Sequence, residues 1–561
     1  MFFSNYKQFY LEDGTFDLKS YRYAGHGFFD VLGEIILILV FGGYYAWGVV
    51  RLVDFIKYIQ TQYEAISGLI PQGVADLVLG NAWQVAVAFI AVYILTLGVN
   101  YLIVRFFSKW AAWFMYGTAI LQMIMFGLIF YYLSPSNFPD YPWWLRWIFL
   151  VPLVLQIVIM TIWHKKFALA VEYTKMSCLV VWQERKLLVP QFVQTFWIFT
   201  LLFFHFVFTA NTFLGLDSFD GTTIEFYGKS IEITETWAYI GYSVAFVFLV
   251  YIVIFVTLTM KINMVHHWYR GGNLSWWHAW GIARRRWWAV MTYAFTSTII
   301  HSIKFVRKLL KKEIEPKNLF ESLKTSFDLL PENPMALEPF ARQKRKAKRA
   351  ARKGVKGIRF GLLARLRWRK QFRKEVPLYK RIWLAMNYFT LPAISIEDKP
   401  FFLALPRSLH TVIQNIPDLY IKQSNVNKLF KFIKFASIGL SALLGGTIAW
   451  IIGYFADINK TPLVIVGAIL FGIVGSMSSL LVLNDLNMSY ITLMYIHTID
   501  KLHGKEGYTR FDLEPHEHIQ TRIEEKMIKR DRRRRKWGLK RKYEEELDAS
   551  KELSDFQPEV D

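Results

Sequence analysis

Apolar residues gather along the chain in runs of about twenty, and charged or polar stretches separate the runs. In an α-helix, about 20 such residues cross the roughly 30 Å hydrocarbon core of a bilayer. Two shorter runs occur at 287–303 and 382–396. Eight runs are long enough to cross: 31–53, 83–106, 111–133, 144–163, 192–213, 237–260, 435–456 and 463–483. The pattern predicts an all-α, polytopic integral membrane helix bundle, with eight full spans and a re-entrant or half-length helix pair.

The charge between the runs predicts their orientation. Lys and Arg lie at 105–110, 164–190 and 261–286, and these three stretches would all lie on one side of the membrane. The positive-inside rule makes that side the cytoplasm and predicts that both termini are cytoplasmic. The acidic stretch 217–235 lies on the other side, and its pattern TTIEF-YGK-SIEIT predicts a small external hairpin.

The segment between the two short runs, 304–381, is strongly basic. It holds 25 Lys and Arg against 7 Asp and Glu, which is +18 of the chain's net +23. Residues 342–374 include no acidic residue. We expect this segment to be a cytoplasmic insertion, flanked by helices that dip into the membrane and return.

The expected organisation has six parts. They are an N-terminal cytoplasmic segment (1–30), a membrane bundle of six spans (31–260), an interfacial helix with the first short element (261–303), the basic insertion (304–381), a broken helix, surface helix and two-span hairpin (382–490), and a cytoplasmic tail (491–561) with a basic helix and an acidic end.

Composition agrees with a membrane protein that carries basic appendages. Hydrophobic residues make up 54% of the chain and aromatic residues 17%, although the net charge is +23. A disordered chain of this charge would have few aromatics. We find no cleavable signal peptide, and we expect a multi-pass integral protein of a prokaryotic cell membrane.

The motifs of common enzymes and metal sites are missing from the sequence. There is no P-loop, GxSxG or HExxH pattern, and the single Cys178 excludes intramolecular disulfides and multi-cysteine metal sites. His266 and His267 are adjacent, so they would face different ways on a helix. We therefore expect no bound metal, no cofactor and no enzymatic activity.

Polar residues inside membrane runs are candidates for a solute or ion path, because burying them in lipid is costly. Four residues are selected on this ground: Gln122, Gln156, His205 and Glu397. The alternative is that they only form structural hydrogen bonds or anchor helix ends.

Small residues recur every fourth position in the last two runs, which lets helix backbones approach closely. They predict a tight helix hairpin or, alternatively, an oligomer interface or sliding surface. The residues are Ser437, Ser441, Gly445, Ala449 and Gly453 in one run, and Ala468, Gly472 and Ser476 in the next.

The basic segments are candidates for partner binding. Clustered Lys and Arg beside a membrane attract anionic lipid headgroups, and dense positive charge also suits RNA, such as a membrane-docked ribosome, or a protein complex. The candidate residues are Arg342, Lys344, Arg345, Lys346, Lys348, Arg349, Arg352, Lys353, Arg365, Arg367 and Arg369, with Arg532, Arg533, Arg534 and Arg535 in the tail.

Two stretches, NLSWWHAWGIARRRWWAVMTYAF (273–295) and WLAMNYFTLPAISIEDKPFFLALPRS (383–408), resemble an uncharacterised family of prokaryotic multi-pass membrane proteins, a domain of unknown function. The resemblance covers about 240–500 and implies a bundle with a broken central helix pair, although 304–381 interrupts it here. Choline-transporter-like proteins are a remoter analogy. The matching residues are Ala283, Arg284, Arg285, Phe389, Pro392, Glu397, Ala404, Arg407 and Ser408.

The resemblance gives two local expectations and leaves two functions open. Pro392 should interrupt the second short run, and Glu397 should pair with Arg407. The first hypothesis is a membrane scaffold or anchor whose basic segments recruit lipid, RNA or a protein complex. The alternative is a transporter or channel for a small solute or ion.

Overall fold

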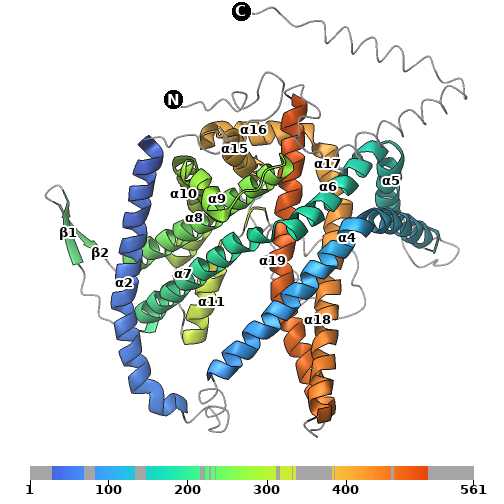
Figure 1. Cartoon of the computed structure of the whole chain (residues 1–561). Helices are drawn as coiled ribbons and strands as arrows, with labels where there is room; N and C mark the ends of the chain where they lie inside the picture. Colours follow the sequence, from blue (N-terminus) through green and yellow to red (C-terminus); the bar gives the residue numbers. More distant parts are fainter. Residues whose placement is uncertain are drawn as a thin grey trace, which may run out of the picture. The chain divides into compact units, whose positions relative to one another are not determined.

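The computed structural model describes residues 28–67, 82–132, 147–214, 222–226, 229–233, 235–310, 316, 318–331, 333–335, 382–383, 386–455 and 460–502. Within these residues the chain forms helices and one two-stranded hairpin (Figure 1). The hairpin pairs Thr222 with Ile233 and Phe226 with Lys229, which confirms the hairpin predicted at this position.

The first half comprises α2 (Phe28–Ser67), α4 (Ala82–Tyr132), α5 (Trp147–Thr161), α6 (His164–Gln183), the 3₁₀ turn η3 (Arg185–Leu187), α7 (Leu188–Leu214), β1 (Thr222–Phe226), β2 (Lys229–Ile233) and α8 (Glu235–Tyr269). The second half comprises α9 (Trp276–Arg284), α10 (Trp287–Leu310), α11 (Leu319–Leu329), α15 (Thr390–Glu397), α16 (Phe401–Gln414), α17 (Ile416–Ile421), the π-helical turn η4 (Lys422–Val426), α18 (Asn427–Phe455) and α19 (Lys460–Leu502).

Six of the described helices are long and apolar enough to cross a membrane, as expected of a multi-pass membrane protein. A bent pair, Leu150–Thr161 with His164–Gln183, makes a seventh if it counts as one span, and its two halves meet at 83°. The six stretches are Phe28–Lys57, Ile90–Tyr132, Arg185–Phe213, Trp237–Tyr269, Ile416–Ile451 and Val464–Asp500.

Two of the predicted spans, 83–106 and 111–133, are one continuous helix, α4. The charges of Arg105 and Lys109 led us to expect a turn at 105–110. That expectation is wrong, since neither residue interrupts a helix and the stretch has no Gly or Pro. Treating each charged stretch as a loop therefore predicts more separate helices than the described residues form.

The run expected to be short, 287–303, continues to Leu310 as the 24-residue helix α10. It lies antiparallel to α8, because Tyr293 stacks on Phe255 with ring centroids 4.2 Å apart, and Phe305 lies 6.2 Å from Tyr239. At 1.5 Å per residue α10 is about 36 Å long, but it is not among the six stretches that are both long and apolar enough to cross a membrane.

The first part of the predicted basic insertion packs with the bundle. Residues 319–329 form α11, an amphipathic helix that lies against α7. Ser322 and Ser326 are buried, and Leu319 packs against the cluster that contains Phe55 and Val207. The boundary expected at 304 is thus displaced, and residues 336–381 lie outside the described residues.

The second short run is interrupted where we expected. The chain turns at Asn387–Phe389, and α15 begins at Thr390. Pro392 occupies the first turn of α15, where its missing N–H leaves no hydrogen bond unmade. The same residue in a helix running through from 382 would lack a backbone bond, so the run breaks just before it.

Helices α18 and α19 form a close hairpin at the predicted small residues. A methyl group added at Gly445 would lie 2.5 Å from the carbonyl oxygen of Gly467. Ser437, Ser441, Ala449 and Gly453 are buried, as expected.

On α19 the contact face is centred one residue earlier than predicted. Gly467 and Gly475 make the closest approaches, whereas Ala468 and Gly472 touch Gly446 and Ala442 from the edge of the contact. Ser476 is only partly buried.

Candidate functional site: buried charges on helix α19

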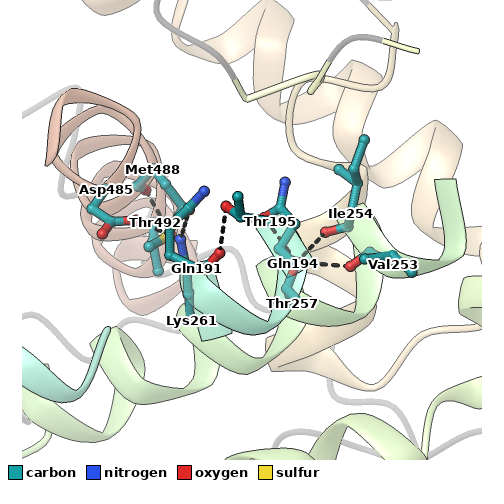
Figure 2. A network of polar contacts seen from close by, with 10 residues as sticks. All are labelled: Gln191, Gln194, Thr195, Val253, Ile254, Thr257, Lys261, Asp485, Met488 and Thr492. Carbon is teal, nitrogen blue, oxygen red and sulfur yellow. Dashed lines mark hydrogen bonds and ion pairs between the residues drawn. The ribbon is translucent and has the colours of Figure 1, made fainter. Parts of the chain in front are cut away.

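A buried ion pair joins helices α8 and α19. Lys261 Nζ lies 2.6 Å from Asp485 Oδ1, and the two side chains are 2% and 1% exposed (Figure 2). Lys261 also donates to Gln191 Oε1 on α7. All three residues belong to stretches that are long and apolar enough to cross a membrane. The three helices therefore meet at a charged point inside the bundle.

Further polar contacts join α7 and α8 next to this ion pair. Thr257, one turn before Lys261, donates to Gln194 Oε1 at 3.0 Å, and Figure 2 shows Gln191 and Gln194 on the same stretch of α7. Because Gln191 bonds Lys261 and Gln194 bonds Thr257, the two helices are held by successive polar contacts. Such contacts fix the position of the ammonium group opposite Asp485.

The carboxylate of Asp485 is only half satisfied. Its Oδ2 is buried and has no hydrogen-bond partner among the described residues. The Tyr101 hydroxyl on α4 is likewise buried without a partner in the described part of the chain, and it lies close enough to feel the charge of Asp485. An unsatisfied buried acceptor costs about 1–3 kcal/mol, so this oxygen marks a place where a donor or cation would be stabilised.

The apolar pattern conceals this pair. It places Lys261 in the loop 261–286 and Asp485 at the end of the last span, but α8 continues to Tyr269 and α19 to Leu502. The signal in the sequence is the absence of Gly and Pro from 251–269 and 477–502. Helix α8 ends only at Gly271, whose φ of 78° is the left-handed conformation that glycine adopts without strain.

A second buried pair joins the same two helices further along. Arg270 Nη2 lies 2.5 Å from Asp500 Oδ1, and both side chains are buried. Residue numbers rise in the same order in the two pairs, so α8 and α19 run in the same direction. Two charge pairs thus fix the register between these helices.

A third cluster surrounds Glu397 at the end of α15. Arg407 donates to Glu397 Oε1 over 2.9 Å, which confirms the expected pair. Lys399 lies 3.1 Å from the other carboxylate oxygen, and the Tyr495 hydroxyl of α19 donates to the carboxylate as well. Burial alone would raise the pKa of Glu397, but the charge of Arg407 and the Tyr495 hydroxyl outweigh it, so the pKa lies below the usual value.

The candidate His205 connects three helices. Its Nδ1 lies 2.8 Å from Ser326 Oγ on α11, and its Nε2 lies 3.1 Å from Ser243 Oγ on α8. The ring is fully buried on α7. His205 therefore holds α11 in the bundle.

Helix α11 is half the length of a span and ends inside the bundle. His301 Nε2 on α10 lies 3.1 Å from the Leu329 carbonyl oxygen, and Pro331 prevents the helix from continuing. The backbone then reaches α19, where Asn487 donates to the Met335 carbonyl oxygen. Asn487 lies two residues after Asp485, so the non-helical end of this element meets α19 at the level of the first charge pair but on a different side of the helix.

The other two candidates lie elsewhere. Gln156 on α5 donates to Asn425 Oδ1 in η4 over 3.4 Å, and Gln122 on α4 accepts from Lys428 Nζ on α18 over 2.5 Å. The four candidates therefore do not converge on one path. They occupy four separate helix contacts.

Some of the residues selected from the sequence lie outside the part of the chain that the structure describes. The basic candidates between 342 and 369 and between 532 and 535 lie outside the described residues. Among the residues that the structure describes, no group of three or more His, Cys, Asp or Glu side chains could hold a metal ion. His266 and His267 have rings at 89° to each other, as their adjacency suggested.

No known protein family and no curated protein matches this chain. The resemblance to an uncharacterised prokaryotic family therefore stays a prediction. The function of this protein is therefore inferred from its buried charged residues.

Proposed function

We propose that this protein is a transporter or channel for a small cation or for protons, with the Lys261–Asp485 pair at the centre of its path. The observation that carries the proposal is the Oδ2 of a buried carboxylate, which has no partner among the described residues and lies inside helices of membrane-spanning length. Ionisable residues at such positions usually serve ion paths or proton relays.

The cost of burying two charges favours a functional role of this pair over a structural one. Removing two charges from water costs several kcal/mol per ion, and replacing a buried pair by apolar residues is often neutral or stabilising. A pair that served only to hold α8 against α19 would be an expensive means of packing. Small residues or leucines would serve equally well in a bilayer.

The half-length helix supports the same proposal. Transporters often place their binding site where a discontinuous helix ends near the middle of the membrane, because its free backbone groups can bind ions. Here the backbone at Met335 lies against Asn487, whose Oδ1 is buried without a partner among the described residues. Two such oxygens, on Asp485 and Asn487, thus lie within one turn of α19, on different sides of the helix.

The chemistry of the pair suggests a simple exchange. A proton or cation bound by Asp485 competes with the Lys261 ammonium for the carboxylate. Lys261 keeps a second acceptor in Gln191 Oε1, so it has a place to remain when the carboxylate is neutralised. Binding at Asp485 would then weaken the contact between α8 and α19 and allow the helices to move.

The test is ion flux in reconstituted vesicles. Proteoliposomes would be given inward gradients of protons, Na⁺ or K⁺ in turn, each with an internal dye that responds to the ion under test. We expect flux through the unmodified protein and its loss in Asp485→Asn. Glu172→Gln is the control, because Glu172 forms a partly exposed pair with Lys175 over 2.8 Å. Absence of flux for all three ions, or full flux in Asp485→Asn, would refute the proposal.

A charge exchange separates the functional role from a structural one. Lys261→Asp combined with Asp485→Lys keeps an ion pair between the helices. If the pair only holds the bundle together, this variant should fold and retain flux. We expect it to fold and to lose flux, because the acidic group would then lie on α8 and no longer beside Tyr101 of α4.

The scaffold hypothesis stays a prediction that rests on the basic residues of 342–374 and 526–542. Deleting 342–374 should abolish recruitment of the protein's partner, or of anionic liposomes, while the helical bundle remains folded. Unchanged recruitment would exclude this role for the segment.

A further inference from the structure

An open apolar groove runs between α4 and α18, away from the charged centre. It has a volume of about 1110 Å³ and is lined almost entirely by apolar side chains, among them Leu102, Trp113 and Leu440. Its floor is aromatic, since the rings of Phe114 and Phe432 lie 4.2 Å apart. The volume lies slightly above the ~300–1,000 Å³ typical of small-molecule sites.

The groove follows one face of α18. Its lining residues Phe432, Ala436, Leu440 and Leu444 recur every four residues, so they form a stripe along the helix. From Phe432 to Thr447 the stripe is about 22 Å long at 1.5 Å per residue. This length exceeds the roughly 15 Å half-thickness of the hydrocarbon core, so an acyl chain can lie along it.

A lysine closes one end of the stripe. Lys428 lies one turn before Phe432 and donates to Gln122 of α4, which follows the lining residue Leu121. In the part of the chain that the structure describes, no carboxylate pairs with Lys428. Its charge therefore lacks a counter-ion among these residues.

Two further lysines lie along these helices, Lys434 on α18 and the exposed Lys109 on α4. Neither lines the groove, and each is two residues from a lining phenylalanine, Phe432 or Phe107, so it points to a different side of its helix. The positive charge at the end of the groove is therefore that of Lys428. The groove thus combines an apolar channel with positive charge at one end, the pattern of a lipid tail and an anionic headgroup.

We propose that this groove binds one anionic phospholipid, with its phosphate beside Lys428 and an acyl chain along Phe432–Thr447. Charge complementarity selects this occupant. A second copy of the chain would present its own apolar face and would leave Lys428 without a counter-ion. A zwitterionic lipid would add a positive group beside it. The site is distinct from the basic segments considered for lipid binding from the sequence.

Gly117 offers a direct way to block the groove. It lines the groove, is exposed, and has nothing within 4 Å of the place where a Cβ atom would lie, so a leucine there enters open space. Gly127→Leu is the matched control on the same helix, because Gly127 also has nothing within 4 Å and does not line the groove.

The experiment measures lipid binding to the full chain purified in mild detergent. Phosphatidylglycerol and phosphatidylcholine would each be titrated and the bound lipids counted by native mass spectrometry. We expect one phosphatidylglycerol to bind more tightly than phosphatidylcholine. Lys428→Gln should weaken its affinity about fivefold, the equivalent of ~1 kcal/mol for one lysine near a headgroup.

The groove variants complete the test. Gly117→Leu should lose the bound phosphatidylglycerol, and Gly127→Leu should keep it. Equal binding of the two lipids, or retention of phosphatidylglycerol in Gly117→Leu, would overturn the proposal. A dimer that dissociates in Gly117→Leu would also overturn it, since it would identify a second copy as the occupant.

Discussion

Removing the positive partner from the Lys261–Asp485 pair should destabilise the bundle strongly. Two unit charges 2.6 Å apart attract by about 6 kcal/mol at an effective dielectric of ~20. Both side chains are at most 2% exposed, so solvent hardly screens this attraction. Lys261→Met leaves Asp485 buried and uncompensated, and we expect a loss of about 3–5 kcal/mol in the free energy of unfolding.

Replacing both charges should restore most of that stability. In Lys261→Met with Asp485→Leu, neither ion has to be removed from water. The double variant should therefore lie within about 1–2 kcal/mol of the unmodified protein, which implies strong coupling between the two sites. Lys175→Met is the control, because its pair with Glu172 is partly exposed and should contribute at most ~1 kcal/mol.

The assay is equilibrium unfolding in detergent micelles, followed by circular dichroism, for the unmodified protein, both single variants and the double variant. If Lys261→Met costs no more than Lys175→Met, the two charges are not buried together and the reasoning fails. Additive losses in the double variant would equally contradict it, because the pair would then have no interaction to restore.

Three further predictions concern other contacts. The pKa of Glu397 is lowered in the folded protein, so its contribution to stability is complete above its ordinary value of 4.5 and is lost as the pH falls below it; Glu397→Gln should flatten this acid dependence in pH-resolved thermal melts. Gly445→Leu should disrupt the α18–α19 hairpin and lower the melting temperature by several degrees, whereas Gly439→Leu, with nothing within 4 Å, should not. Ser326→Ala should cost about 0.5–1.5 kcal/mol, because His205 Nδ1 loses its 2.8 Å bond and keeps only a 3.4 Å contact with Thr209 Oγ1, and hydrogen exchange in α11 should rise.

Local features of the fold could be predicted because neighbouring residues decide them. The β1–β2 hairpin follows from alternating residues around a short turn, and the interruption before Pro392 follows from a missing backbone N–H. The pair of Glu397 with Arg407, which was expected from the family resemblance, joins two groups that only ten residues separate. In each case the stretch of sequence contains all the groups that interact.

Helix ends are harder to predict from hydropathy. Hydropathy indicates which residues avoid water, and it does not indicate where the backbone stops being helical. Lys261 and Lys109 end the apolar runs, yet a lysine continues an α-helix as readily as a leucine does. Helices α4 and α8 therefore extend beyond the runs that identify them. Hydropathy does not predict helix α11 at all, because a half-length amphipathic helix has too few apolar residues to form a run.

From the sequence alone one can tell that this is a helical chain with many apolar segments, and that most of its net charge lies in one segment. Which charges pair depends on how the helices pack. Lys261 and Asp485 are 224 positions apart, and His205 and Ser326 are 121 apart. No local pattern links such residues, because their pairing depends on how the helices pack. The bundle removes water from both partners, and burial then turns two ordinary charges into a strong and specific contact.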